Sequence, residues 1–188
     1  VIQVGVNQGS GNDNLTPLLD TDIGYSLAVQ NTQAGIDGQI IDGRGGNDQI
    51  SGSGADDKLI GGDGADHLIG GNGEDVLVGS AGNDLYFVTS GDKVVESAGE
   101  GTDEISTDRL TFNLTVGDLV NVENLSYTGA GDFTGTGNDS DNRISGGTGN
   151  DILDGGAGND TLIGGAGADT LNGEAGNDTF IVKGDSGS

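Results

Sequence analysis

A nine-residue repeat constrains this sequence more than any other feature. It runs without a gap from Gly43 to Phe87 and again from Gly146 to Ile181, with glycine at positions one, two and four, aspartate at position six and a large apolar residue at position eight. Two regular copies are GGDGADHLI at 61–69 and GGAGNDTLI at 155–163. A period this short predicts a stacked repeat architecture, because one copy alone cannot bury its apolar residue.

Each copy predicts a tight turn followed by a very short strand. The glycines permit backbone angles that other residues avoid, so positions one to six form the turn. Positions seven to nine form a strand whose middle residue points inward, since side chains alternate across a strand. Two copies make one coil of about 18 residues, and stacked coils make an all-β fold with two parallel sheets. The predicted inward residues are Ile50, Leu59, Leu68, Leu77 and Tyr86, then Leu153, Leu162, Leu171 and Phe180.

The composition indicates that a large apolar core is not what stabilises this fold. The chain has 188 residues, of which 40 are glycine and 31% are hydrophobic, and its net charge is -25. Such chains bury too little apolar surface to offset their conformational entropy. We therefore expect a bound cation to neutralise part of the charge and to stabilise the fold. The same acidity argues against nucleic acid as a partner, and no apolar run is long enough for direct membrane insertion.

The spacing of the aspartates predicts where cations bind. Turns of copies n and n+2 lie on the same side of the solenoid, about 4.7 to 4.9 Å apart. Calcium takes oxygen ligands at about 2.3 to 2.6 Å, so an ion between two such turns reaches both. Oxygen ligands without cysteine favour calcium over zinc or copper. The aspartates are Asp48, Asp57, Asp66, Asp75, Asp84, Asp151, Asp160, Asp169 and Asp178. Same-side pairs give about five ions, or about seven if Asn142 and the array ends contribute.

These residues resemble the RTX (repeats-in-toxin) family, whose nonapeptide GGxGxDxUx is a calcium-binding signature. The resemblance covers 43–87 and 137–181. It implies a parallel β-roll that forms when calcium binds, in proteins exported by bacterial type I secretion, where such arrays accompany enzymes, cytolysins or adhesins. The copies depart from the pattern at Arg44, Ser53, Ala55 and Asn142.

The resemblance also implies a second set of calcium ligands. In that family, backbone carbonyls of turn positions one to four join the position-six aspartates around each ion. Carried over to this sequence, the turn residues are Gly43, Gly45, Gly61, Gly62, Asp63, Gly64, Gly70, Asn72, Gly73, Gly146, Thr148, Gly149, Gly155, Ala157, Gly158, Gly164, Ala166 and Gly167.

Four segments are expected along the chain. Residues 1–42 form an N-terminal cap or flanking β segment, 43–87 the first array, 88–136 an irregular bridging β segment, and 137–188 the second array with a C-terminal tail. A separate linker is the alternative for 88–136, where Asp103 is a further candidate ligand. Because the chain contains no methionine, we expect it to be a piece of a longer protein.

The sequence predicts a module without catalytic activity. Its single histidine, His67, occupies an outward position of a repeat, so nucleophile, base and orienting acid cannot be assembled. We expect a calcium-binding module that folds outside a bacterial cell and stabilises, or assists the secretion of, a larger enzyme or toxin. The alternative is a structural or carbohydrate-binding module of a calcium-dependent surface adhesin or surface layer. The expected partners are calcium, the rest of the parent polypeptide and, in the second case, a polysaccharide.

Overall fold

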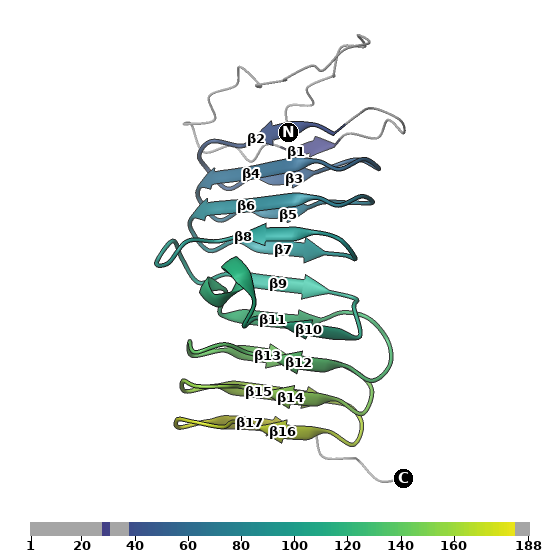
Figure 1. The fold of residues 1–188 in the computed structure, drawn as a ribbon, viewed down its shortest axis with the longest axis vertical. Helices are drawn as coiled ribbons and strands as arrows, with labels where there is room; N and C mark the ends of the chain where they lie inside the picture. The colour runs from purple at the N-terminus through teal and green to yellow at the C-terminus, as the bar shows by residue number, and fades with distance from the viewer. Residues whose placement is uncertain (1–27, 31–37, 183–188) are drawn as a thin grey trace. The chain divides into compact units, whose positions relative to one another are not determined.

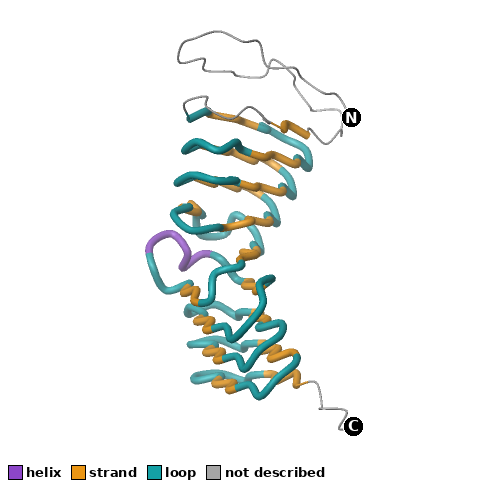
Figure 2. Tube along the Cα trace, turned by 90° about the vertical axis from the view of Figure 1, so that its right-hand side faces the viewer, coloured by secondary structure: helices purple, strands orange, loops and turns teal. Residues whose placement is uncertain are grey.

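The computed structural model describes residues 28–30 and 38–182, with side chains from residue 38 onward (Figure 1). The chain divides into two compact units, one ending at Thr102 and the other beginning at Asp103. Most of the predicted cap at 1–42 and the end of the predicted tail lie outside the described residues. In each unit, short strands alternate with turns, and one 3-10 helix, η1 (Gly117–Asn121), interrupts the second unit (Figure 2).

The first unit contains two parallel sheets. One sheet has the order β1-β3-β5-β7 and the other the order β2-β4-β6-β8. The strands of the first sheet are β1 (Ala28–Gln30), β3 (Gln49–Ser51), β5 (His67–Ile69) and β7 (Leu85–Val88). Those of the second are β2 (Ile40–Asp42), β4 (Lys58–Asp63), β6 (Val76–Ala81) and β8 (Lys93–Val95). Successive strands alternate between the sheets, which is the topology of a parallel β-solenoid.

The second unit repeats this plan in the orders β9-β11-β13-β15-β17 and β10-β12-β14-β16. The strands of the longer sheet are β9 (Glu104–Thr107), β11 (Asn124–Tyr127), β13 (Arg143–Ser145), β15 (Thr161–Gly165) and β17 (Thr179–Val182). Those of the shorter sheet are β10 (Thr111–Asn113), β12 (Thr134–Thr136), β14 (Ile152–Asp154) and β16 (Thr170–Asn172). The predicted all-β parallel solenoid is therefore confirmed in both units.

The position-eight residues form the core between the two sheets. Leu59 pairs with Leu77 in one sheet and Leu68 with Tyr86 in the other, and all four are fully buried. Only one side chain in each repeat enters this core, since the flanking strand residues point outward. The apolar ladders that the repeat predicts are therefore present.

Two of the predicted inward residues are not buried. Leu171 is half-buried, and Phe180 is 49% exposed although it pairs with Leu162 in the expected register. Both lie on the last described strands of their sheets, β16 and β17. A ladder residue is covered only when a coil stacks on each side of it. The prediction is therefore wrong for the burial of these two side chains.

The coils within 88–136 are irregular because their strand spacing departs from 18 residues. Glu104 pairs with Asn124 and Thr111 with Thr134, so these coils contain extra residues. The added chain includes η1 between β10 and β11. Burial is maintained by aromatic packing, since the rings of Tyr127 and Phe133 stack with centroids 4.6 Å apart. The segment keeps the solenoid topology while losing the nonapeptide pattern.

Candidate metal sites in the turns

The glycine-rich turns bring backbone carbonyls of neighbouring coils close together. In the turn at 61–66, Gly62 and Gly64 have φ angles of 108° and 135°, a region that favours glycine. A Cβ atom on Gly62 would lie 2.1 Å from the carbonyl oxygen of Arg44, and one on Gly64 would lie 2.0 Å from that of Gly46. Glycine is therefore required here both for backbone conformation and for close approach of the preceding same-side turn.

Backbone hydrogen bonds hold these turns in register. The Asp63 N–H donates to the Arg44 carbonyl at 2.8 Å, and the Gly46 N–H donates to the Asp63 carbonyl at 2.7 Å. The second array has the same pattern, in which Ala166 N–H donates to the Gly147 carbonyl at 2.9 Å. Because a carbonyl oxygen has two lone pairs, each of these acceptors can also bind a cation.

One oxygen of a position-six aspartate typically connects two coils. Asp66 Oδ1 accepts a hydrogen bond from the Asp48 N–H at 2.7 Å. The structure brings together all five same-side pairs in this way, by an N–H donating to an Oδ1 one coil later. The pairs are Asp48 with Asp66, Asp57 with Asp75, Asp66 with Asp84, Asp151 with Asp169, and Asp160 with Asp178.

The other carboxylate oxygen points back into its own turn. A Cβ atom on Gly61 would lie 2.2 Å from Asp66 Oδ2, and one on Gly155 would lie 2.3 Å from Asp160 Oδ2. Among the described residues, Oδ2 is buried without a hydrogen-bond partner in Asp66, Asp75, Asp151 and Asp160. A buried carboxylate oxygen without a donor is costly. The donor set, made of carboxylate and carbonyl oxygens alone, fits calcium.

The pKa values of these aspartates reflect the same burial. Desolvation raises the pKa of Asp66 and of Asp75 from the ordinary value of 3.8 to about 6, and neighbouring carboxylates add to the rise. Backbone hydrogen bonds lower the pKa but do not compensate. Desolvation also raises the pKa of Asp151 and Asp160. A bound cation would favour the charged form and oppose this shift.

Acid is therefore expected to weaken calcium binding. Protons compete with the ion for a carboxylate of pKa about 6, so affinity at pH 5 should be about tenfold lower per site than at pH 7. Without calcium the sign reverses. A pKa raised above its unfolded value stabilises the folded state below pH 3.8, and this contribution is lost as pH rises to about 6. Free calcium at half-saturation, measured at both pH values and constant ionic strength, tests the expectation, and equal values would contradict it.

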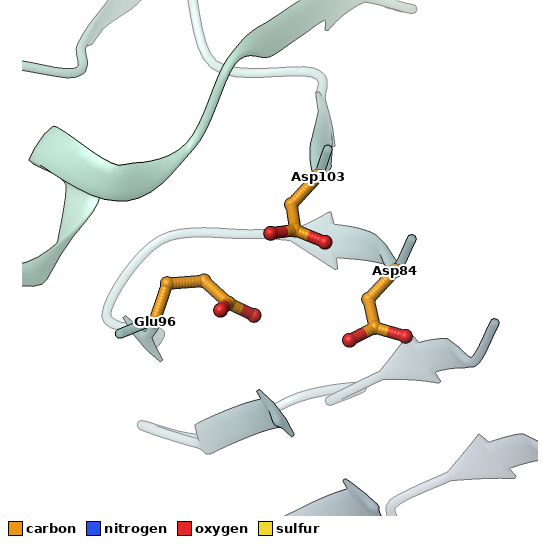
Figure 3. Close-up of side chains that lie close together, drawn as sticks. All are labelled: Asp84, Glu96 and Asp103. Atoms are coloured by element: carbon orange, nitrogen blue, oxygen red, sulfur yellow. The ribbon is translucent and has the colours of Figure 1, made fainter. Parts of the chain in front are cut away.

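The structure adds acidic residues that the repeat does not reveal. In the first unit, Glu96 is buried, accepts a hydrogen bond from the Tyr86 hydroxyl and has a carboxylate oxygen within 4.8 Å of one of Asp84 (Figure 3). In the second unit, Glu123 Oε2 accepts the Asp103 N–H at 2.9 Å, as an aspartate does one coil later in the regular turns. The only sequence signal for Glu96 is its position two residues after the inward Val94, on the same face of the chain.

Within the described part of the chain, the buried Nε2 of the single histidine has no hydrogen-bond partner. His67 lies on β5 and packs against Phe87, with ring centroids 4.8 Å apart.

The part of the chain that the structure describes contains no helix with the length and apolar character of a membrane span.

Comparison with known proteins identifies the class. The family described as RTX calcium-binding nonapeptide repeat matches four times, at residues 34–68, 51–86, 136–171 and 154–186, which together make up more than half of the chain. The chain belongs to this family. Its repeats are calcium-binding, of a kind typical of secreted bacterial proteins, and they form a structural module that is not itself catalytic.

A curated relative shows the context in which such repeats occur. The chain is similar to endo-1,3-1,4-beta-glycanase ExsH of Rhizobium meliloti (strain 1021), with 44% identity over 64 residues. The matched segment is 34% of this chain and 12% of that protein, so the chain spans a small part of its relative.

Proposed function

We propose that this chain is a calcium-dependent folding module of a larger secreted protein. The observation that supports it most directly is that Oδ2 of Asp66, Asp151 and Asp160 is buried without a hydrogen-bond partner among the described residues, and each of these oxygens is directed at the glycine that begins its turn. Calcium between same-side turns would satisfy these oxygens and offset part of the net charge of -25. The carboxylates that carry these oxygens, their same-side partners and the carbonyls of their turns are the proposed ligands.

Coupling of folding to calcium gives the module its role in secretion. Without the ion, the like charges and the 40 glycines favour an expanded chain. Affinities typical of extracellular modules, about 10⁻⁴ to 10⁻³ M, leave the sites empty at cytosolic calcium and fill them outside the cell. The chain would therefore leave the cell unfolded, fold afterwards and stabilise the enzyme or toxin attached to it.

Calcium binding to the isolated chain tests this function directly. Equilibrium dialysis followed by elemental analysis should find several calcium ions per chain at millimolar calcium. Magnesium at the same concentration should bind far more weakly, because it requires a smaller and more rigid octahedral site. Absence of bound calcium at millimolar concentration, or equal binding of magnesium, would refute the proposal.

A second candidate function is polysaccharide binding by a surface protein. The outer face of the sheet formed by β10, β12, β14 and β16 carries the row Thr111, Thr134, Ile152 and Thr170, in which three of the four side chains have a hydroxyl group. The similarity to a glycanase over 64 residues places related repeats in a protein named for its action on a polysaccharide. Pull-down with insoluble β-glucan in calcium and in EGTA tests this function. If the chain binds the polysaccharide, the β-glucan should retain it in calcium but not in EGTA, and replacement of Thr134 by a bulky charged residue should abolish this retention.

A further inference from the structure

Not all turns have the same internal hydrogen bonds. In the turn at 52–57, the Ser53 N–H and Oγ both donate to Asp57 Oδ2, at 2.6 and 3.0 Å. The Gln39 N–H donates to Asp57 Oδ1 at 2.7 Å. Both oxygens of Asp57 therefore have hydrogen-bond donors within the protein. Asp66 differs, since its Oδ2 is equally buried but has no donor among the described residues.

Two other turns share this arrangement. The Thr89 N–H and Oγ1 donate to Asp92 Oδ2 at 2.7 and 3.1 Å. The Asn138 N–H donates to Asn142 Oδ1 at 2.7 Å, and the Asn142 Nδ2 donates to the Glu123 carbonyl at 3.0 Å. We call the turns 52–57, 88–92 and 137–142 closed turns. In each of them, the backbone N–H of the residue at position two donates to the side-chain oxygen that is directed into the turn, and in the first two turns a hydroxyl group donates to it as well.

The backbone conformation at position two separates closed turns from the others, because Ser53, Thr89 and Asn138 lack the left-handed φ that the other turns have there. Ser80, like Ser53, occupies position two, but Ser80 has a φ of 74° and is followed by Gly82 at position four, with a φ of 144°. The closed turns have Ala55 or Ser140 at position four, and the turn at 88–92 is one residue shorter. In 52–57 the Ala55 N–H donates back to Ser53 Oγ at 3.4 Å instead of to another coil.

In the regular turns, the N–H at position four donates to a neighbouring coil instead of to its own turn. The Gly64 N–H donates at 2.7 Å to the Ala81 carbonyl in the next same-side turn. We call turns with a left-handed φ at both position two and position four open turns. They begin at Gly43, Gly61, Gly70, Gly79, Gly146, Gly155, Gly164 and Gly173.

We propose that calcium binds only between two open turns and that the closed turns use hydrogen bonds in place of an ion. This inference rests on the proposed function and assigns its sites. In a closed turn, N–H and hydroxyl donors direct their positive ends at the oxygen a cation would need, so binding would require those bonds to break. The pair Asp57 with Asp75 and the contribution of Asn142 are then removed from the predicted set, which leaves about four ions.

A matched pair of substitutions tests the assignment. Asp57 and Asp66 are equally buried, and each can be changed to asparagine, the residue already present as Asn142 in a closed turn. Equilibrium dialysis of D57N should give the same number of bound calcium ions as the unmodified chain. D66N should lose up to two, because Asp66 belongs to two open pairs. A D57N chain that loses one ion or more overturns the inference.

A gain of a site provides an independent test. The double variant S53G/A55G restores the open pattern at 52–57, next to the open turn that begins at Gly70, and should bind one additional calcium ion. S80G is the control, since the turn at 79–84 is already open, and its number of ions should not change. If S53G/A55G is folded by circular dichroism and binds the same number of calcium ions as the unmodified chain, the inference is overturned. If the unmodified chain binds no calcium, the proposed function itself fails, which is a distinguishable result.

Discussion

Excess EGTA is expected to unfold this chain at neutral pH, and millimolar calcium to restore the β-sheet. An ion that binds only the folded state adds about 2.7 kcal/mol of stability when its concentration is 100 times the dissociation constant. About four such ions would contribute roughly 11 kcal/mol, which is comparable to the whole stability of a typical domain, about 5 to 15 kcal/mol. The chain has a net charge of -25 and only one inward apolar residue in each repeat, so apolar burial alone offsets little of the charge repulsion and of the conformational entropy lost on folding.

Far-ultraviolet circular dichroism measures this effect. Calcium is titrated back after chelation, and the β-sheet signal should return cooperatively. Sodium chloride at matched ionic strength is the first control, because screening alone reduces repulsion between exposed charges. Magnesium is the second control, and we expect neither to restore the sheet. A sheet signal that persists in EGTA would show that hydrogen bonds and the apolar ladders are sufficient for folding.

Gly155→Ala is expected to remove an ion and to destabilise the second unit. The added Cβ would lie 2.3 Å from Asp160 Oδ2 and 2.8 Å from its Cγ, inside contact distance. Gly155 cannot easily move away, because its N–H donates to the Asn172 carbonyl at 2.8 Å. Overpacking of this kind costs about 1 to 3 kcal/mol. Loss of the ion removes a further contribution of about 2.7 kcal/mol at 100 times the dissociation constant.

Gly54→Ala provides the matched control for this variant. A Cβ on Gly54 would meet no heavy atom within 4 Å, and Gly54 lies in a closed turn. The change should leave the bound calcium unaltered and shift the free energy of unfolding by at most about 1 kcal/mol, through the unfolded state. Urea unfolding at fixed free calcium, together with ion counts, compares the two variants. Equal destabilisation by both would show that contact with the carboxylate is not the cause.

The repeat by itself determined the architecture of the regular coils. Because two nine-residue copies span one coil, residues 18 apart must lie side by side, and the pairing of Asp48 with Asp66 follows without any tertiary information. The same argument places Leu59 under Leu77 in the core. The positions of the aspartates, the glycines and the inward residues can therefore be predicted from the sequence, because a fixed repeat length determines which residues of stacked coils lie side by side.

Only the tertiary structure decided the state of each carboxylate oxygen. Ser53 and Ser80 occupy the same repeat position, yet the first donates a hydrogen bond to Oδ2 of its aspartate and the second has a left-handed φ. The burial of Glu96 and the exposure of Phe180 were likewise not readable from the repeat. These features depend on hydrogen bonds and on stacking with the neighbouring coil, whereas a periodic sequence specifies only where each residue recurs.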